Sequence, residues 1–130
     1  MALMKFREPN QVKWAGSRPG HNGTQVIKSE NGTGVPILMY TVPAGLTFYL
    51  TSWVFSVSDS VGGALGYFHV QDLVPATQYY IGYITTQGVG FLGQEGSFWP
   101  PLEIPTGWRL RVGSNAGTCT ASALIHGWVE

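Results

Sequence analysis

The side chains that could perform acid–base or metal chemistry are few and widely spaced. None of the three histidines has another histidine or a cysteine at metal-ligand spacing; they are His21, His69 and His126. His126 alternates with Leu124 and Trp128, which is typical of a histidine on one face of a strand. Asp72 lies close enough in sequence to pair with His69, but no second ligand accompanies it. The sequence therefore predicts no metal site and no cofactor.

Nucleophilic chemistry has no better support. The single cysteine, Cys119, lies in a small alternating segment (T-C-T-A-S-A), where we expect a buried, unreactive thiol and no intramolecular disulfide. No serine lies in a G-x-S-x-G sequence, and the seven carboxylates are too dispersed to name a glycosidase pair. The glycine run G-V-G-F-L-G at 88–93 is followed by no helix that could bind a phosphate. We therefore expect a protein that is not an enzyme.

Aromatic side chains, by contrast, are dense enough to suggest a binding surface. Such rings stack on sugars and also anchor protein interfaces, and a tyrosine keeps its hydrogen-bonding hydroxyl. The residues singled out are Tyr79, Tyr80, Tyr83, Trp99 and Trp108. Three interpretations stay open: core packing for about half of the aromatic side chains, a subunit interface, or a glycan site. Between the last two, the interface is favoured.

Charge is distributed unevenly along a chain that has a formal net charge of zero. The first 28 residues carry a net charge of +4, because five basic residues face only Glu8; the five are Lys5, Arg7, Lys13, Arg18 and Lys28. The remainder carries −4, so we expect the basic segment to dock on an acidic surface of another copy or of a partner. The alternative is a solvated tail. Because the segment has few aromatic residues between its charges, we expect no nucleic-acid binding.

The elements that would position these residues are strands. One phrase occurs twice, as V-P-A-G-L-T-F-Y-L-T-S at 42–52 and I-P-T-G-W-R-L-R-V-G-S at 104–114. Each copy predicts a tight turn that begins a strand, with Pro suited to the second turn position and Gly to unusual backbone angles. Alternating segments predict strands at 24–28, 36–41, 46–58, 64–71, 77–86, 98–104, 108–114 and 118–130, with a loop or bulged edge at 87–96.

These segments predict an all-β protein without helices. The expected fold is an antiparallel two-sheet sandwich of about eight strands, jelly-roll-like, with an extended N-terminal arm. We expect the arm to cover residues 1–35 and the sandwich to cover residues 36–130. No stretch reaches the roughly 20 apolar residues that would span a bilayer as a helix, so no membrane association is expected. No secretory signal is recognised at the N-terminus.

Three segments resemble small β-sandwich structural proteins of tailed bacteriophages, of the head-decoration or fibre type. They are Y-T-V-P-A-G-L-T-F-Y-L-T-S, P-P-L-E-I-P-T-G-W-R-L-R-V-G-S-N-A and the ending A-S-A-L-I-H-G-W-V-E. The resemblance covers about residues 36–130. It implies a virion component without a cofactor, commonly a homotrimer, whose basic arm would clamp a neighbouring copy or the capsid.

Together, composition and resemblance suggest a capsid decoration or cement subunit, made in the host cytoplasm and carried in the virion. Charged residues make up only 11% of the chain, which favours a surface that is partly covered in an assembly. The expected partners are further copies of the chain and the major capsid protein or another virion protein. The alternative is a carbohydrate- or receptor-binding module of a phage fibre or tail, with a surface glycan as its partner.

Overall fold

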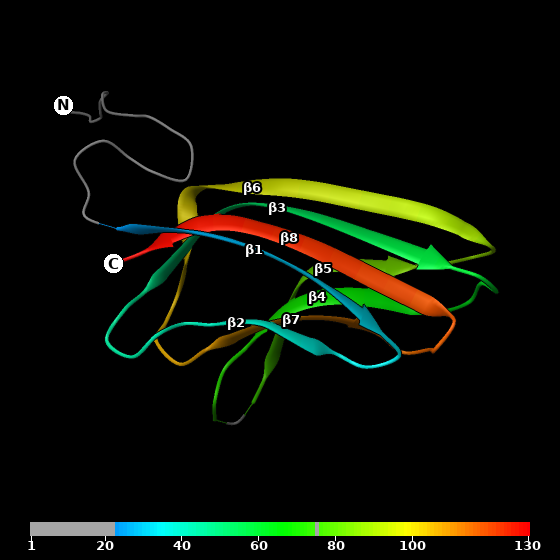
Figure 1. Ribbon diagram of the computed structural model, residues 1–130, viewed down its shortest axis with the longest axis horizontal. Helices are drawn as coiled ribbons and strands as arrows, with labels where there is room; N and C mark the ends of the chain where they lie inside the picture. Colours follow the sequence, from blue (N-terminus) through cyan, green and yellow to red (C-terminus); the bar gives the residue numbers. More distant parts are fainter. Residues whose placement is uncertain (1–22, 75) are drawn as a thin grey trace.

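A computed structural model describes residues 23–74 and 76–130, and these residues form eight strands and no helix (Figure 1). The strands are β1 (Thr24–Thr33), β2 (Ile37–Thr41), β3 (Phe48–Asp59), β4 (Leu65–Gln71), β5 (Gln78–Thr85), β6 (Gly90–Ile104), β7 (Arg109–Ser114) and β8 (Cys119–Val129). Within the described ranges, no helix is long and apolar enough to span a membrane.

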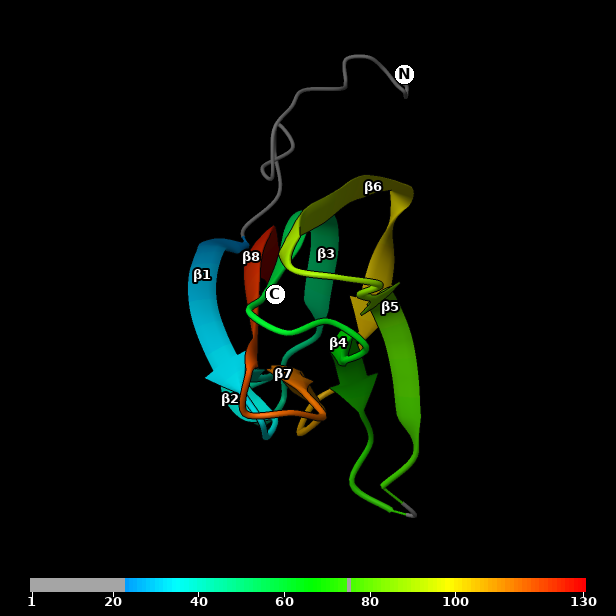
Figure 2. The ribbon, with the colours of Figure 1, turned by 90° about the vertical axis from the view of Figure 1, so that its right-hand side faces the viewer.

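The strands pair as a set of nested hairpins. Strand β1 pairs with β8, β2 with β7, β3 with β6 and β4 with β5, so that each pair encloses the next, and all four pairs are antiparallel. Further pairing of β3 with β8 and of β4 with β7 completes two four-stranded sheets, ordered β1-β8-β3-β6 and β2-β7-β4-β5. Figure 2 shows the two sheets as separate layers. This arrangement is a jelly roll, and it confirms the predicted all-β antiparallel sandwich.

The first strand is longer than the sequence indicated. Thr24–Thr33 pairs along its whole length with β8, so these ten residues form an edge of the first sheet. The expected strand ended at Lys28, inside a stretch of 35 residues interpreted as an arm. The glycines and polar residues of this stretch suggested turns, but pairing with β8 holds Ser29–Thr33 extended as well. Residues 1–22 of the expected arm lie outside the described residues.

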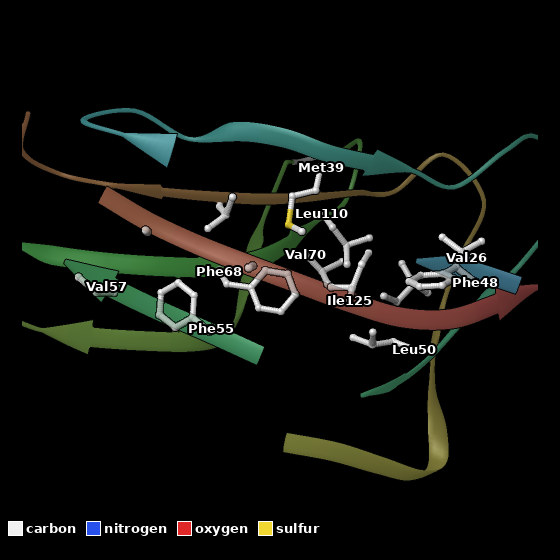
Figure 3. Close-up of a cluster of buried hydrophobic side chains, with 14 of the residues drawn as sticks. Val26, Met39, Phe48, Leu50, Phe55, Val57, Phe68, Val70, Leu110 and Ile125 are labelled. Carbon is white, nitrogen blue, oxygen red and sulfur yellow. The ribbon is translucent and has the colours of Figure 1, made fainter. Parts of the chain in front are cut away.

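The core fills the space between the sheets (Figure 3). Large, fully buried apolar side chains from four strands and one turn form much of it: Phe48, Leu50, Phe55, Phe68, Leu110, Ile125 and Val42. On β7 the predicted alternation is confirmed, because Leu110 and Val112 are buried in the core and alternate with Arg109 and Arg111, which are only partly buried. Cys119 is buried and free, as expected.

A β-bulge explains why β3 has apolar residues in both sequence registers. The register of β3 with both of its neighbours shifts between Leu50 and Ser52. Phe48 and Leu50 face the core before the shift, and Phe55 and Val57 face it afterwards. A one-residue insertion reverses which alternate residues point inward, so strict alternation does not hold across Thr51.

The two copies of the repeated phrase form turns that bind each other. Gly45 and Gly107 have φ values of 79° and 80°, and in each turn the residue after Gly donates to the carbonyl of the preceding Pro. Pro43 and Pro105 therefore occupy the first turn position, not the predicted second one. Val42 joins the turns by accepting from Gly107 N and donating to Trp108 O, both at 2.9 Å. The phrase is thus a paired architectural corner.

The segment from 87 to 104 departs furthest from expectation. Residues 90–104 form one 15-residue edge strand, although 87–96 suggested a loop or a bulged edge and 98–104 only a short segment. Pairing with β3 holds the glycine-rich half of β6 extended. The register shift between β3 and β6 lies near the centre of β6 and accommodates the Pro100-Pro101 pair. The double proline lies on an edge strand, where residues without a backbone donor are tolerated.

Candidate functional site

The five aromatic residues singled out from the sequence lie in three places. Tyr80 and Tyr83 are each 51% exposed on β5. Tyr79 stacks on Trp108 with ring centroids 5.7 Å apart and planes inclined by 8°. Trp99 is 70% exposed on β6, in the other sheet. Only Trp108 packs against the core, so core packing is the wrong interpretation for the three tyrosines and for Trp99.

Two of these tyrosines belong to a larger cluster on the outer face of the β2-β7-β4-β5 sheet. On β4, Phe68 and Val70 point into the core, so the alternating residues point outward; on β7 the same holds around Leu110 and Val112. His69 lies opposite Arg111 on β7 and opposite Tyr80 on β5. We call this cluster the outer tyrosine face; it consists of Tyr67, His69, Tyr80, Tyr83, Arg109 and Arg111.

The rings of this face enclose the imidazole of His69. Tyr67 stacks on it with centroids 5.5 Å apart and planes inclined by 19°. Tyr80 meets it edge-on at 5.6 Å and also meets Tyr67 and Tyr83 edge-on, with centroids 6.0 and 5.3 Å away. These are the separations and inclinations that aromatic pairs prefer. His69 is consequently 0% exposed although it points away from the core.

Burial also sets the protonation of His69. Desolvation, reinforced by the positive charge of Arg111, lowers the pKa of His69 to about 4. The imidazole is therefore neutral at pH 7. Neither of its ring nitrogens has a hydrogen-bond partner among the described residues. Asp72, which the sequence offered as a possible local partner of His69, accepts instead from Thr77 N at 2.8 Å and from Tyr79 Oη at 3.3 Å.

Arg109 and Arg111 bring two positive charges to the same face. Within the described part of the chain neither guanidinium forms an ion pair, and the Nε atom of each is buried without a hydrogen-bond partner. Burial, reinforced by the neighbouring Tyr80, raises the pKa of Tyr67, and the positive charge of nearby Arg111 opposes this rise. The face therefore combines unpaired cationic donors with half-exposed phenols.

A second polar cluster is buried but has a structural role. The Thr86 hydroxyl donates to Asp59 Oδ2 at 2.5 Å, and Asp59 Oδ1 accepts from Val61 N at 3.0 Å. These bonds hold the pKa of the Asp59 carboxyl well below its usual range. Burial and the charge of Asp59 raise the pKa of the nearby Cys119 thiol, which disfavours the thiolate that a nucleophile requires.

Across residues 23–74 and 76–130, no group of three or more His, Cys, Asp or Glu side chains could hold a metal ion. His126 lies on a strand face, as predicted, and its Nε2 contacts Gln25 Nε2 at 2.9 Å. Of the basic residues assigned to partner docking, Lys28 is exposed on β1. The other four, Lys5, Arg7, Lys13 and Arg18, lie outside the described residues.

Sequence reasoning did not assign Tyr67 and His69 to a site. The signal was present in the segment G-Y-F-H-V-Q, where Phe68 and Val70 fit a core face and Tyr67 and His69 therefore share the opposite one. What the segment could not supply is the neighbouring strand that brings Arg111 beside them.

No protein-family model matches the chain, and neither the curated proteins nor the solved structures contain a match to it.

Proposed function

We propose that the protein is a non-enzymatic structural subunit of a tailed-bacteriophage virion, a capsid decoration or cement protein that binds further copies of itself and a capsid protein. The observation that carries this proposal is the outer face of the β1-β8-β3-β6 sheet. Four cross-strand pairs of β3 and β8 occupy its centre: Ser52 with His126, Val54 with Leu124, Ser56 with Ser122 and Ser58 with Thr120. We call these eight residues the hydroxyl face.

The hydroxyl face has the character of a surface that another protein covers. It contains no Asp, Glu, Lys or Arg, and its centre exposes Val54 and Leu124 side by side. Ile27 on the adjoining edge strand is also exposed and lies opposite His126. Monomeric soluble proteins usually intersperse charges over such an area, whereas the fully buried centres of interfaces lack them. The low overall charge and the β-sandwich fold agree with a subunit of an assembly.

The oligomeric state tests this proposal directly. Light scattering at micromolar concentration should report an oligomer, with a trimer expected, and Val54→Asp and Leu124→Asp should dissociate it by placing a charge inside the interface. Val89→Asp is the matched control, because Val89 is exposed in the loop before β6. A wild-type monomer, together with unimpaired capsid binding after removal of residues 1–22, which precede β1, would overturn the proposal.

A second candidate, a carbohydrate- or receptor-binding module of a phage fibre or tail, is supported by the outer tyrosine face. Tyr80 and Tyr83 present half-exposed rings, and aromatic rings pack against the apolar faces of sugars. A glycan array should then give hits that Tyr80→Ala abolishes and that Trp99→Ala, on the other sheet, leaves intact. An array without hits would exclude this candidate while leaving the assembly proposal to be judged by light scattering.

A further inference from the structure

Four buried nitrogens of the outer tyrosine face lack a hydrogen-bond partner among the described residues. They are Nδ1 and Nε2 of His69 and the Nε atoms of Arg109 and Arg111. Native proteins satisfy nearly all buried polar groups with protein, water or a ligand. Here the unsatisfied atoms lie together, since Arg109 and Arg111 are alternate residues of β7 and His69 is the direct cross-strand neighbour of Arg111. Arg109 and Arg111 are only partly buried, so this face presents guanidinium donors that no described residue uses.

The unused groups call for an acceptor, and for a charged one. An arginine side chain carries only donors, arranged in a planar fork that matches a carboxylate. The imidazole of His69 is enclosed by Tyr67 and Tyr80, so the donors that a ligand can reach are those of the arginines. Neither arginine meets a carboxylate within the described residues, so no described side chain neutralises their positive charge. An anionic group bound here would gain charge-assisted hydrogen bonds without breaking an existing ion pair.

The size and setting of the site favour a small anion joined to a ring. Alternate residues of a strand are separated by about 7 Å, so the two arginines address one carboxylate and its neighbours, not an extended row of charges. Tyr80 lies on β5, across His69 from Arg111, and meets Tyr83 edge-on, so two half-exposed rings border the site on one side. Ring surface suits the apolar side of a sugar, and phenols suit its hydroxyl groups.

We propose that the outer tyrosine face binds an acidic saccharide, whose carboxylate is held by Arg109 and Arg111 and whose ring packs against Tyr80 and Tyr83. The proposal rests on the second candidate function and names its ligand class. His69 acts as a positioning residue, because it packs between Tyr67 and Tyr80 and holds the Tyr80 ring in place relative to the arginines. An acidic protein partner is the competing occupant, and the test distinguishes it from a saccharide.

Calorimetric titration with oligogalacturonate tests the proposal against a neutral oligogalactoside of equal length. Oligogalacturonate should bind at least tenfold more tightly than the neutral sugar. Arg111→Gln should weaken its binding at least tenfold, and Tyr80→Ala should also weaken it. Lys28→Gln is the matched control, because it removes one positive charge from an exposed position of the other sheet. If Arg111→Gln does not fold, Arg111→Lys keeps the charge but lacks the planar fork, and should still weaken binding several-fold.

The outcomes separate this proposal from the function on which it rests. Binding of the neutral sugar that equals that of oligogalacturonate would overturn the acidic ligand while preserving glycan recognition. Absence of binding to either sugar would overturn both. Equal losses in Arg111→Gln and Lys28→Gln would show non-specific charge attraction and overturn the site. Polyglutamate binding as tightly as oligogalacturonate, and equally sensitive to Arg111→Gln, would identify a protein-docking face instead.

Discussion

The side-chain amide of Gln94 on β6 bonds to both backbone groups of Tyr83 on β5. Its Oε1 accepts from Tyr83 N, and its Nε2 donates to Tyr83 O, each at 3.4 Å. β5 and β6 are edge strands of opposite sheets, so each has one side without a strand partner. One side chain thus takes the place of a missing peptide group and joins the two sheets along their open side.

We expect Gln94→Ala to lower the free energy of unfolding by about 1 kcal/mol, because two long hydrogen bonds are replaced by contacts with water. Chemical denaturation measures this change, and hydrogen exchange of the Tyr83 amide should become faster. Gln87→Ala is the matched control, since Gln87 is exposed in the loop before β6. Unchanged exchange at Tyr83 would show that the bridge does not hold in solution.

A glycine of β5 makes room for a core ring. A Cβ atom at Gly82 would lie 2.8 Å from Phe55 Cδ2, and Phe55 is fully buried, so the ring cannot move aside easily. Gly82→Ala should therefore destabilise the fold by about 1–3 kcal/mol through overpacking. Gly88→Ala, where a Cβ would meet nothing within 4 Å, should change stability by no more than about 0.5 kcal/mol. Equal effects of the two variants in thermal unfolding would contradict this assignment.

The paired corner permits a similar comparison between its two glycines. Both need positive φ, but a Cβ at Gly45 would meet nothing within 4 Å, whereas at Gly107 it would lie 2.9 Å from Leu73 Cδ1. Gly45→Ala should cost about 1–2 kcal/mol from backbone strain alone. Gly107→Ala should cost the same or somewhat more, limited by how readily the exposed Leu73 moves. Denaturation midpoints of the two variants check the order, and a stabilising effect at either position would refute the strained-turn account.

Local patterns in the sequence were sufficient for most of the fold. Leu110 and Val112 alternate with arginines, and the P-x-G phrases mark corners, so β7 and both turns were predictable from neighbouring residues alone. The bulge at Thr51 was not predictable, because β3 has apolar residues at both odd and even positions. Only the pairing of β3 with β6 and β8 reveals the insertion. The strand character of Gly90–Gly96 was also missed, since glycine has a low strand propensity and pairing with β3 overrides it.

The candidate site was less predictable than the fold, because its members come from different strands. Tyr80 and Tyr83 were selected for their residue type, and the structure leaves both exposed. The sequence suggested only Asp72 as a possible partner of His69, whereas its cross-strand neighbours are Arg111 and Tyr80 on the flanking strands. Short-range reasoning cannot supply such cross-strand neighbours. The grouping of Tyr79 with Tyr80 failed for a related reason: Tyr79 stacks instead on Trp108, which precedes β7.

The buried imidazole predicts a pH-dependent stability. The pKa of His69 falls from its ordinary value of 6.5 to about 4 in the folded protein, mainly because burial disfavours the charged form. As the pH falls below 6.5, the unfolded chain takes up a proton that the folded chain does not, so unfolding becomes easier. The loss should accumulate between pH 6.5 and 4, reach about 1–3 kcal/mol, and then stop. Denaturant titrations across this range measure it.

His69→Leu should remove that slope and leave stability at pH 7 unchanged or slightly higher, because it eliminates two buried nitrogens without hydrogen-bond partners. His126→Leu keeps His69 and should keep the slope. Asp59 also makes the protein less stable in acid, but at lower pH than His69. The folded-state pKa of Asp59 is depressed, so its contribution to stability disappears only as its carboxylate is protonated. A wild-type stability that is flat from pH 6.5 to 4 would mean that His69 is protonated in the folded protein. Water or a counter-ion would then have to reach His69 between the rings of Tyr67 and Tyr80, and the description of this imidazole as enclosed would be wrong.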